Sequence, residues 1–246
     1  MVATKKNKEK QMDNSNFLIP DASHFSGDPD WSALAKDSRF FGAIIKATEG
    51  ISYGHDSWFK KHWRPLREAG ANRERWLRGV YHYLIFTDAD APEMQADYFA
   101  TTVEEADTTK GFGKGEIMPI IDVELGADSS PNHRATKQRV IDYTSRFAGH
   151  LKARWRCRVM LYGHSAMLDL HIEDKMGCDR LWLPSYTKQP ADPAAIGWAP
   201  EEVLLWQYTD GNHNKTDYPS TAPGIKSADI SVLYHRDGVD WGEFNA

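Results

Sequence analysis

The sequence lacks several features that would each define a class of protein. Only two cysteines occur, Cys157 and Cys178, so a disulfide-rich scaffold is excluded. One disulfide and two buried free thiols are both compatible with that count. No apolar run approaches the ~18 residues of a membrane-spanning helix, so we expect no membrane insertion. The formal net charge of -5 argues against a general nucleic-acid binder.

Motifs for metals, phosphates and dinucleotides are also missing. The ten histidines show no His-x-x-x-His spacing and the cysteines are not closely paired, so we expect no metal or cofactor. The segment 163–167 follows a predicted strand, as a nucleophile elbow does, but Met167 stands where that elbow needs glycine. We therefore interpret Ser165 as a helix cap, and His82 as a hydrogen-bonded histidine of the core.

The remaining composition is that of a single globular domain of 246 residues, 41% of them apolar. Residues 1–16 are polar and lysine-rich and lack the apolar centre of a secretory signal, so we expect a disordered tail there. Residues 17–246 show no break in composition and are expected to form one domain. The 12% aromatic share suits a protein that binds sugar rings, although aromatic residues also build cores.

Eight short apolar segments predict eight strands, and helical patterns separate the first five. This order favours an α/β fold, a single parallel (β/α) barrel similar to a TIM barrel, over a sandwich. The connections 187–202 and 210–227 are rich in Pro, Gly, Asn and Asp, so we expect fewer than eight helices. Helices are predicted near 28–31, over 57–69, from about 90 and from Pro131. The predicted strands are 16–23, 40–46, 79–86, 117–124, 158–163, 180–186, 203–209 and 228–233.

The fourth predicted strand ends in two acids, Asp122 and Glu124, with Val123 between them. Side chains alternate along a strand, so both carboxylates point to one side, roughly 7 Å apart at about 3.3 Å per residue. Burial and mutual repulsion raise the pKa of one of them and make it a candidate general acid. The alternative is that two solvated acids simply follow a strand.

Other polar residues lie at the ends of other predicted strands. In a (β/α) barrel these ends surround one site, which here would be an acidic groove lined by aromatic residues. That composition suits cleavage of a glycosidic bond by carboxylates. An arginine cluster between 64 and 78 could meet an anionic polymer, but we prefer a solvated helix end. The converging residues are Asp21, Lys46, Tyr81, Tyr83, Asp122, Glu124, Tyr162, Tyr186, Gln207 and Asp229.

Six blocks, in one order along the chain, resemble the family 25 glycoside hydrolases. These enzymes are lysozymes, or N-acetylmuramidases, and bacteriophages often encode them. The resemblance implies an eight-stranded barrel with fewer than eight helices. The blocks are Asp21-Ala22-Ser23-His24, Lys46-Ala47-Thr48-Glu49-Gly50, Gly79-Val80-Tyr81-His82-Tyr83, Pro119-Ile120-Ile121-Asp122-Val123-Glu124, Leu181-Trp182 with Tyr186, and Trp206-Gln207-Tyr208-Thr209, with Asp229 in the position of the last acid.

The resemblance also implies an activity and residue roles. The reaction is hydrolysis of the β-1,4 bond between N-acetylmuramic acid and N-acetylglucosamine in peptidoglycan. Glu124 becomes the general acid/base, and Asp122 orients the N-acetyl group if that group is the internal nucleophile. Asp21 and Asp229 complete the catalytic set by shaping the field around it. The expected substrate-binding residues are Lys46, Tyr81, Tyr162, Trp182, Tyr186 and Gln207.

Two positions depart from the family pattern, and two other functions stay open. Pro184 replaces a small residue, and Ser231 replaces an asparagine two positions after the last acid. A chitinase-like family 18 hydrolase would carry further acids upstream of Asp122, where this chain has Ile120 and 117–119. A catalytically inactive peptidoglycan-binding barrel would lack the acidic pair. No export signal is visible, so we expect the protein to reach the cell wall by phage-type release or another route. We also expect it to be a monomer.

Overall fold

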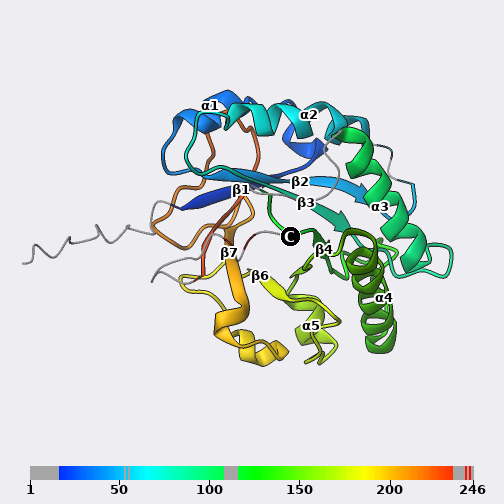
Figure 1. Cartoon of the computed structure of the whole chain (residues 1–246). Helices are drawn as coiled ribbons and strands as arrows, with labels where there is room; N and C mark the ends of the chain where they lie inside the picture. Colours follow the sequence, from blue (N-terminus) through cyan, green and yellow to red (C-terminus); the bar gives the residue numbers. More distant parts are fainter. Residues whose placement is uncertain are drawn as a thin grey trace, which may run out of the picture.

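The barrel predicted from the sequence is present. The structure, a computed structural model, describes residues 17–52, 54, 56–107, 116–234, 242 and 244, so the expected tail over 1–16 lies outside the described residues. Eight strands close into a barrel in chain order (Figure 1). They are β1 (Leu18–Ala22), β2 (Gly42–Glu49), β3 (Leu77–Tyr83), β4 (Ile120–Asp122), β5 (Met160–Tyr162), β6 (Arg180–Pro184), β7 (Val203–Thr209) and β8 (Asp229–Leu233).

Five α-helices occur in the described part of the chain, which confirms the prediction of fewer than eight. The connection from β6 to β7 holds only the short 3-10 turns η3 (Pro193–Ile196) and η4 (Pro200–Glu202), and a third turn, η2 (His24–Ser26), follows β1. In Figure 1, α1 and α2 cover one side of the barrel, and α3 and α4 lie side by side next to it. The helices are α1 (Trp31–Lys36), α2 (Asp56–Ala69), α3 (Pro92–Ala106), α4 (Lys137–Trp155) and α5 (Ser165–Asp169).

Two helix starts differ from the prediction. Helix α4 begins at Lys137 rather than at Pro131, because the side chain of Thr136 accepts a hydrogen bond from the backbone N–H of Arg139 and caps the helix there. Ser165 is the first residue of α5, whereas the cap position belongs to His164, which makes no side-chain cap hydrogen bond. The interpretation of Ser165 as the cap was therefore wrong.

Strand β8 runs against its neighbours. Strands β1 to β7 pair in parallel, as predicted, whereas β8 pairs antiparallel with both β7 and β1. A wholly parallel barrel was therefore the wrong expectation. Because β8 is reversed, it begins at the end of the barrel where the other strands finish. This places Asp229, the first residue of β8, directly opposite Asp21 of β1.

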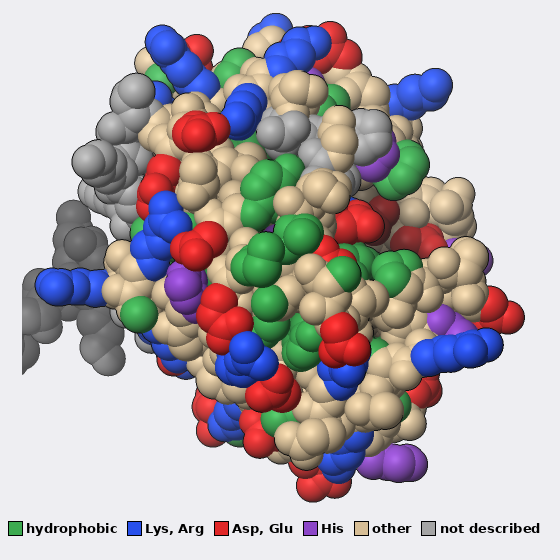
Figure 2. All heavy atoms as spheres, turned by 90° about the vertical axis from the view of Figure 1, so that its right-hand side faces the viewer, with side chains coloured by type: hydrophobic (Ala, Val, Ile, Leu, Met, Phe, Trp, Pro, Cys, Tyr) green, Lys and Arg blue, Asp and Glu red, His purple; other side chains and the backbone are tan. Residues whose placement is uncertain are grey.

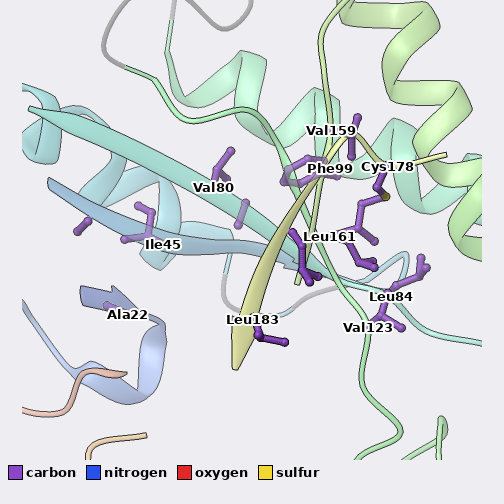
Figure 3. Packing of buried hydrophobic residues seen from close by; sticks show 14 of the residues in the cluster. Ala22, Ile45, Val80, Leu84, Phe99, Val123, Val159, Leu161, Cys178 and Leu183 are labelled. Carbon is purple, nitrogen blue, oxygen red and sulfur yellow. The ribbon is translucent and has the colours of Figure 1, made fainter. Parts of the chain in front are cut away.

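The core has two layers because neighbouring side chains on each strand alternate between the barrel interior and the helices. Ile120 belongs to the interior cluster and Ile121 to the outer one, and both are fully buried. Figure 3 shows part of the outer layer, where Val80, Phe99 and Leu161 lie between strands and helices. Continued past Ile120, the alternation directs Asp122 and Glu124 towards the barrel axis.

Aromatic rings fill the end of the barrel at which β1 begins. The ring of Phe17 stacks on Phe41 with centroids 4.8 Å apart and on Phe244 with centroids 6.0 Å apart. Phe17 and Phe244 are buried, and the backbone carbonyl of Phe244 accepts a hydrogen bond from Met118. Apolar rings therefore close this end, while the polar residues gather at the opposite one.

The arginines between 64 and 78 divide into two kinds: Arg64, 69% exposed and paired with Glu68 four residues on, fits the expected solvated helix end, whereas Arg73 and Arg78 are structural. The Arg78 guanidinium is 3% exposed, pairs with Asp107 and Glu116, and lies 3.9 Å from the centre of the Trp63 ring. Arg73 donates hydrogen bonds to backbone carbonyl groups, including that of Phe40 at 3.0 Å. Arg73 and Arg78 are thus bound within the protein and are not available to an anionic polymer.

Two further expectations concern cysteines and membranes. Cys157 and Cys178 are both free thiols, so of the two compatible states the structure has the unpaired one. Burial raises the pKa of the Cys157 thiol to about 11, which keeps it in the poorly reactive protonated form at neutral pH. Among the described residues, no helix is long and apolar enough to cross a membrane.

Candidate active site

Four acidic side chains from three strands line one hollow at the end of the barrel where β2 and β3 finish. Asp21 comes from β1, Asp122 ends β4, Glu124 follows it, and Asp229 opens β8. Tyr81, Tyr162 and Trp182 complete the lining of this hollow, whose volume is about 290 Å³. Figure 2 faces this end of the molecule and shows acidic side chains recessed in a hollow of the surface.

Asp122 and Glu124 form one hydrogen-bonded pair of carboxyl groups. Burial raises the pKa of both, and their mutual repulsion raises that of Asp122 further, while nearby Lys46 opposes the rise. The pair therefore titrates as a unit that keeps a proton to higher pH than a solvated acid. The Oδ1 atom of Asp122 is buried and has no hydrogen-bond partner.

The backbone around this pair is fixed by three neighbours. The Val123 N–H donates to the Tyr162 carbonyl at 2.9 Å, which continues the β4–β5 ladder beyond Asp122. The buried amide of Asn132 then donates from Nδ2 to the Glu124 carbonyl at 3.0 Å. Gly163 lies against Val123 so closely that a Cβ there would be 2.7 Å from the Val123 carbonyl oxygen. The acids thus sit on a rigid backbone just past the end of the strand.

Asp21 and Asp229 form a second pair, joined by the side chain of Gln207. The Gln207 Nε2 donates to Asp21 Oδ2 at 2.8 Å and, more weakly, to Asp229 Oδ2 at 3.5 Å. Its Oε1 accepts from the hydroxyl groups of Tyr162 and Tyr186, each at 2.8 Å. Burial is the main cause that raises the Asp21 pKa well above its usual value and the Asp229 pKa to about 7.

A second hollow of about 440 Å³ adjoins the first. It shares Asp21, Tyr81 and Asp229 with the acidic hollow, so the two form one cleft. Phe25, in the turn η2 after β1, lines the second hollow with 80% of its surface exposed. An acidic centre beside an aromatic-rimmed extension is the shape expected of a site that binds several sugar units.

Comparison with known proteins identifies the family. The model of the glycosyl hydrolases family 25 matches residues 20–216, which contain the Asp122–Glu124 pair. The chain belongs to glycosyl hydrolase family 25. It is a glycoside hydrolase of the lysozyme class, and the resemblance given by the six sequence blocks is confirmed.

Solved structures share the barrel along most of the chain. The structure is similar to a family 25 glycosyl hydrolase from Bacillus anthracis, with 25% identity, a TM-score of 0.66 and 95% of each chain covered. It is similar to a bacterial lysozyme from Streptomyces coelicolor at 20% identity and TM-score 0.68, covering 88% of this chain and 91% of that one. The catalytic domain of endolysin ply40, from a bacteriophage of Listeria monocytogenes, is 21% identical with TM-score 0.64, covering 91% and 94%.

One further match is short. The large ribosomal subunit protein bL31B of Micrococcus luteus is 36% identical over 66 residues, which is 27% of this chain and 73% of that protein. A segment of this length cannot contain the eight-stranded barrel, whereas the family 25 match spans most of it. We therefore infer no ribosomal role.

In this family 25 hydrolase, several residues predicted to bind substrate are held by the protein itself. Gln207 is 1% exposed and uses both amide atoms on neighbours, so it positions other groups. Trp182 is 2% exposed and donates from Nε1 to Ser231 Oγ at 2.8 Å. The departure of Ser231 from the family pattern thus has a local use, because its hydroxyl fixes an indole that lines the acidic hollow.

Of the other predicted substrate-binding residues, two line the open space, whereas Lys46 and Tyr186 line neither hollow. Tyr81 lines both hollows, and Tyr162 lines the acidic one. Lys46 pairs with Glu49 at 2.6 Å and stands 4.8 Å from the centre of the Tyr83 ring. The Tyr186 hydroxyl is bound to Gln207, which ties it to the second acid pair.

Residues that suggested other chemistry do not join this site. His82 is fully buried, with its ring nitrogens 2.8 Å from Thr48 Oγ1 and 3.0 Å from Gln95 Oε1, which confirms its role in the core. Burial lowers the His82 pKa to about 3, so its ring is neutral near pH 7. Ser165 lines neither hollow. Within the described residues, no group of three or more His, Cys, Asp or Glu side chains is arranged to hold a metal ion.

Two residues of the site were missed by the sequence reasoning. Asn132, which binds the Glu124 carbonyl, fell in a predicted helix, and only its place beside Pro131 signalled a turn. Phe25 follows the acid of the first strand, in Ser23-His24-Phe25-Ser26-Gly27, and an apolar residue between polar ones was the available signal.

Proposed function

We propose that this family 25 hydrolase is an N-acetylmuramidase that cleaves the β-1,4 bond between N-acetylmuramic acid and N-acetylglucosamine in bacterial peptidoglycan. The observation that carries this is the buried Asp122–Glu124 pair, whose two side chains both line the acidic hollow. A sugar bearing an acetamide on C2 supplies an N–H that donates to the Asp122 carboxylate in this hollow. Relatives described as a lysozyme and a muramidase support the same substrate class.

The two acids of the pair take different roles in this mechanism. The substrate acetamide N–H donates to the Asp122 carboxylate, which stabilises the charged form of Asp122 and leaves the shared proton on Glu124. Glu124 then protonates the glycosidic oxygen as the bond to the anomeric carbon breaks. The acetamide oxygen forms the new bond to that carbon, and the leaving sugar departs with the proton.

Water completes the reaction. Glu124, now a carboxylate, takes a proton from a water molecule that attacks the anomeric carbon and opens the cyclic intermediate. Asp122 stays paired with the acetamide N–H throughout, so the positive charge that develops on the nitrogen lies beside an anion. Lys46 helps to keep Asp122 charged, because it lowers the pKa of both carboxyl groups.

Asp21 and Asp229 act on the substrate from the opposite wall of the hollow. With pKa values raised by burial, at least one of them stays protonated near neutral pH and can donate to a sugar oxygen. Gln207, Tyr162 and Tyr186 hold this wall in place. We further propose that the protein acts as a monomer on the cell wall, reached by phage-type release or another export route.

The products of digestion test this function. Purified peptidoglycan should yield new reducing ends at N-acetylmuramic acid, and Glu124→Gln should abolish this release while the folded enzyme still binds cell walls. Reducing ends at N-acetylglucosamine, or a preference for chitin oligomers, favour the chitinase-like alternative. Binding without any release of reducing ends favours an inactive binding barrel.

A further inference from the structure

The second hollow of the cleft has no role in the mechanism above, yet it is continuous with the acidic hollow. Asp21, Tyr81 and Asp229 belong to both, so a chain of sugars bound at the acids has open space beside it. Ser23 and Ser227 lie in the lining of the second hollow and offer hydroxyl groups, while Ser26, also in the lining, is buried. Phe25 supplies its apolar surface.

Phe25 is unusual among the large apolar side chains. Within the described part of the chain, the exposed ones are Phe25 at 80%, Met94 at 53% and Leu168 at 37%. Of these three, only Phe25 lines a hollow of the cleft. Burial elsewhere in the protein therefore does not account for this ring, and its exposed surface is available to a ligand.

The turn that carries Phe25 is held in one shape. The Phe25 N–H donates to Ser23 Oγ at 3.4 Å, and the Ser23 N–H donates to Ser26 Oγ at 3.3 Å. After the turn, the Gly27 carbonyl accepts a bond from Trp58 Nε1 at 2.6 Å. A ring on a backbone fixed before the ligand arrives loses little conformational entropy on binding.

A flat apolar ring surrounded by hydroxyl groups matches the two kinds of surface on a pyranose. The C–H face of a sugar packs on an aromatic ring, while the hydroxyl groups around its edge need polar partners such as Ser23 and Ser227. A stem peptide has no such flat face. The chemistry of the hollow thus favours a sugar unit over the peptide part of the wall.

We propose that Phe25 is the stacking platform of a second sugar-binding subsite, which holds an N-acetylhexosamine unit of the glycan strand next to the unit at the acids. The inference rests on the proposed function. It places longer glycan strands across both hollows, so affinity rises with chain length. Short substrates that occupy only the acidic hollow do not use Phe25.

The experiment measures binding by a catalytically inert protein, Glu124→Gln, to purified peptidoglycan glycan oligomers of two and four sugar units. We expect the tetrasaccharide to bind more tightly than the disaccharide. Adding Phe25→Ala should weaken tetrasaccharide binding roughly three- to tenfold, the scale of one aromatic contact, and leave disaccharide binding unchanged. Phe25→Trp should restore the tetrasaccharide affinity, and Met94→Ala is the matched control on an exposed apolar residue.

The outcomes separate this inference from the proposed function. If tetrasaccharide affinity is the same with and without Phe25, the subsite is elsewhere and the inference is overturned. Equal weakening for both oligomers also overturns it, because that result marks a general distortion of the cleft. If Glu124→Gln binds neither oligomer while it binds chitin oligomers, the proposed substrate is wrong as well.

Discussion

The two acid pairs of the cleft are built in opposite ways. Asp122 and Glu124 come from one strand end and touch each other, and one oxygen of Asp122 has no partner. Asp21 and Asp229 come from two antiparallel strands and share the amide of Gln207. The first pair keeps hydrogen-bonding capacity for a ligand, whereas the second is tied into the protein.

This difference explains how a barrel can hold four acids at one end and remain stable. Burying a carboxyl group without a partner costs about 1–3 kcal/mol, and the Gln207 network avoids part of that cost for the second pair. The Asp122–Glu124 pair lowers the stability of the fold, because one buried oxygen of Asp122 has no hydrogen-bond partner, and functional sites often show such a loss. Reactivity and structural support are thus divided between opposite walls of one hollow.

The functional difference between the two pairs is tested most directly by neutralising one acid of each pair. Glu124→Gln should lower kcat by about 10²–10⁴-fold, since it removes the proton donor. Asp229→Asn keeps a polar group opposite Asp21 and should lower kcat by about tenfold. Rates of reducing-end release measure both. Equal losses in the two variants would remove the functional distinction between the pairs.

For stability we expect the opposite order: changes at the Asp21–Asp229 pair should matter more than changes at the Asp122–Glu124 pair. Gln207→Ala leaves the hydroxyl groups of Tyr162 and Tyr186 and a carboxylate oxygen of Asp21 without their partner, and should cost about 2–4 kcal/mol in urea unfolding. Asp122→Asn removes a buried ionisable group and should leave the free energy of unfolding at pH 7 unchanged or higher. A large loss of stability in Asp122→Asn contradicts this division.

The pairs also differ in how their backbones are anchored. The strand ladder holds Asp21 and Asp229, whereas Glu124 lies past its strand and depends on Asn132. Asn132→Ala should lower kcat by about tenfold with little change in KM, because the acid loses its alignment. Asn214→Ala, which removes a side-chain bond to the Tyr218 carbonyl in the β7–β8 loop, is the control and should leave kcat unchanged.

The smallest effect concerns the pH dependence of stability. The Asp229 pKa rises from 3.8 to about 7 on folding, so the folded protein binds more protons than the unfolded chain between these values. The contribution of the Asp229 carboxyl group to the free energy of unfolding is fully present below pH 3.8 and is lost as the pH rises to about 7. Asp229→Asn should remove part of this slope, at most about 1.4 kcal/mol per pH unit.

Urea unfolding across that pH range measures the slope, and Asp169→Asn, at an exposed acid outside the cleft, is the control. A slope unchanged by Asp229→Asn would mean that its carboxyl group titrates as in the unfolded chain. In that case the two acid pairs differ only in their hydrogen bonds and not in the pKa shift of Asp229.

Strands were predictable because burial on both faces leaves an apolar run in the sequence. The direction of β8 was not predictable, since alternation looks the same for a strand of either direction. In a parallel strand Asp229, as the first residue, would lie at the opposite end of the barrel from the site. The reversed direction of β8 brings it to the site. The pair Asp122 and Glu124 was predictable because both residues lie on one strand, and spacing alone places them on one side.

The role of Gln207 was out of reach for a different reason. Its amide joins Asp21 to Tyr162 and Tyr186, which are brought together only when the barrel closes. The sequence marks Gln207 as polar at a strand end, and that pattern alone suggests contact with substrate. Asn132 was missed because its side chain binds backbone groups, whose positions depend on the fold rather than on nearby residues.

The reversed strand β8 also shapes how this enzyme can vary. Since β7 ends and β8 begins at the same rim, the connection 210–228 need not cross the barrel. It packs against the start of α1, where the Asp30 N–H donates to the Gly224 carbonyl at 2.8 Å, and its last residues, Ser227 and Ala228, line the second hollow. A bond from the strand also holds the connection, since the Tyr208 hydroxyl of β7 donates to the Pro219 carbonyl at 2.6 Å. Changes in the length of this connection would therefore reshape the edge of the second hollow without disturbing the strands of the barrel.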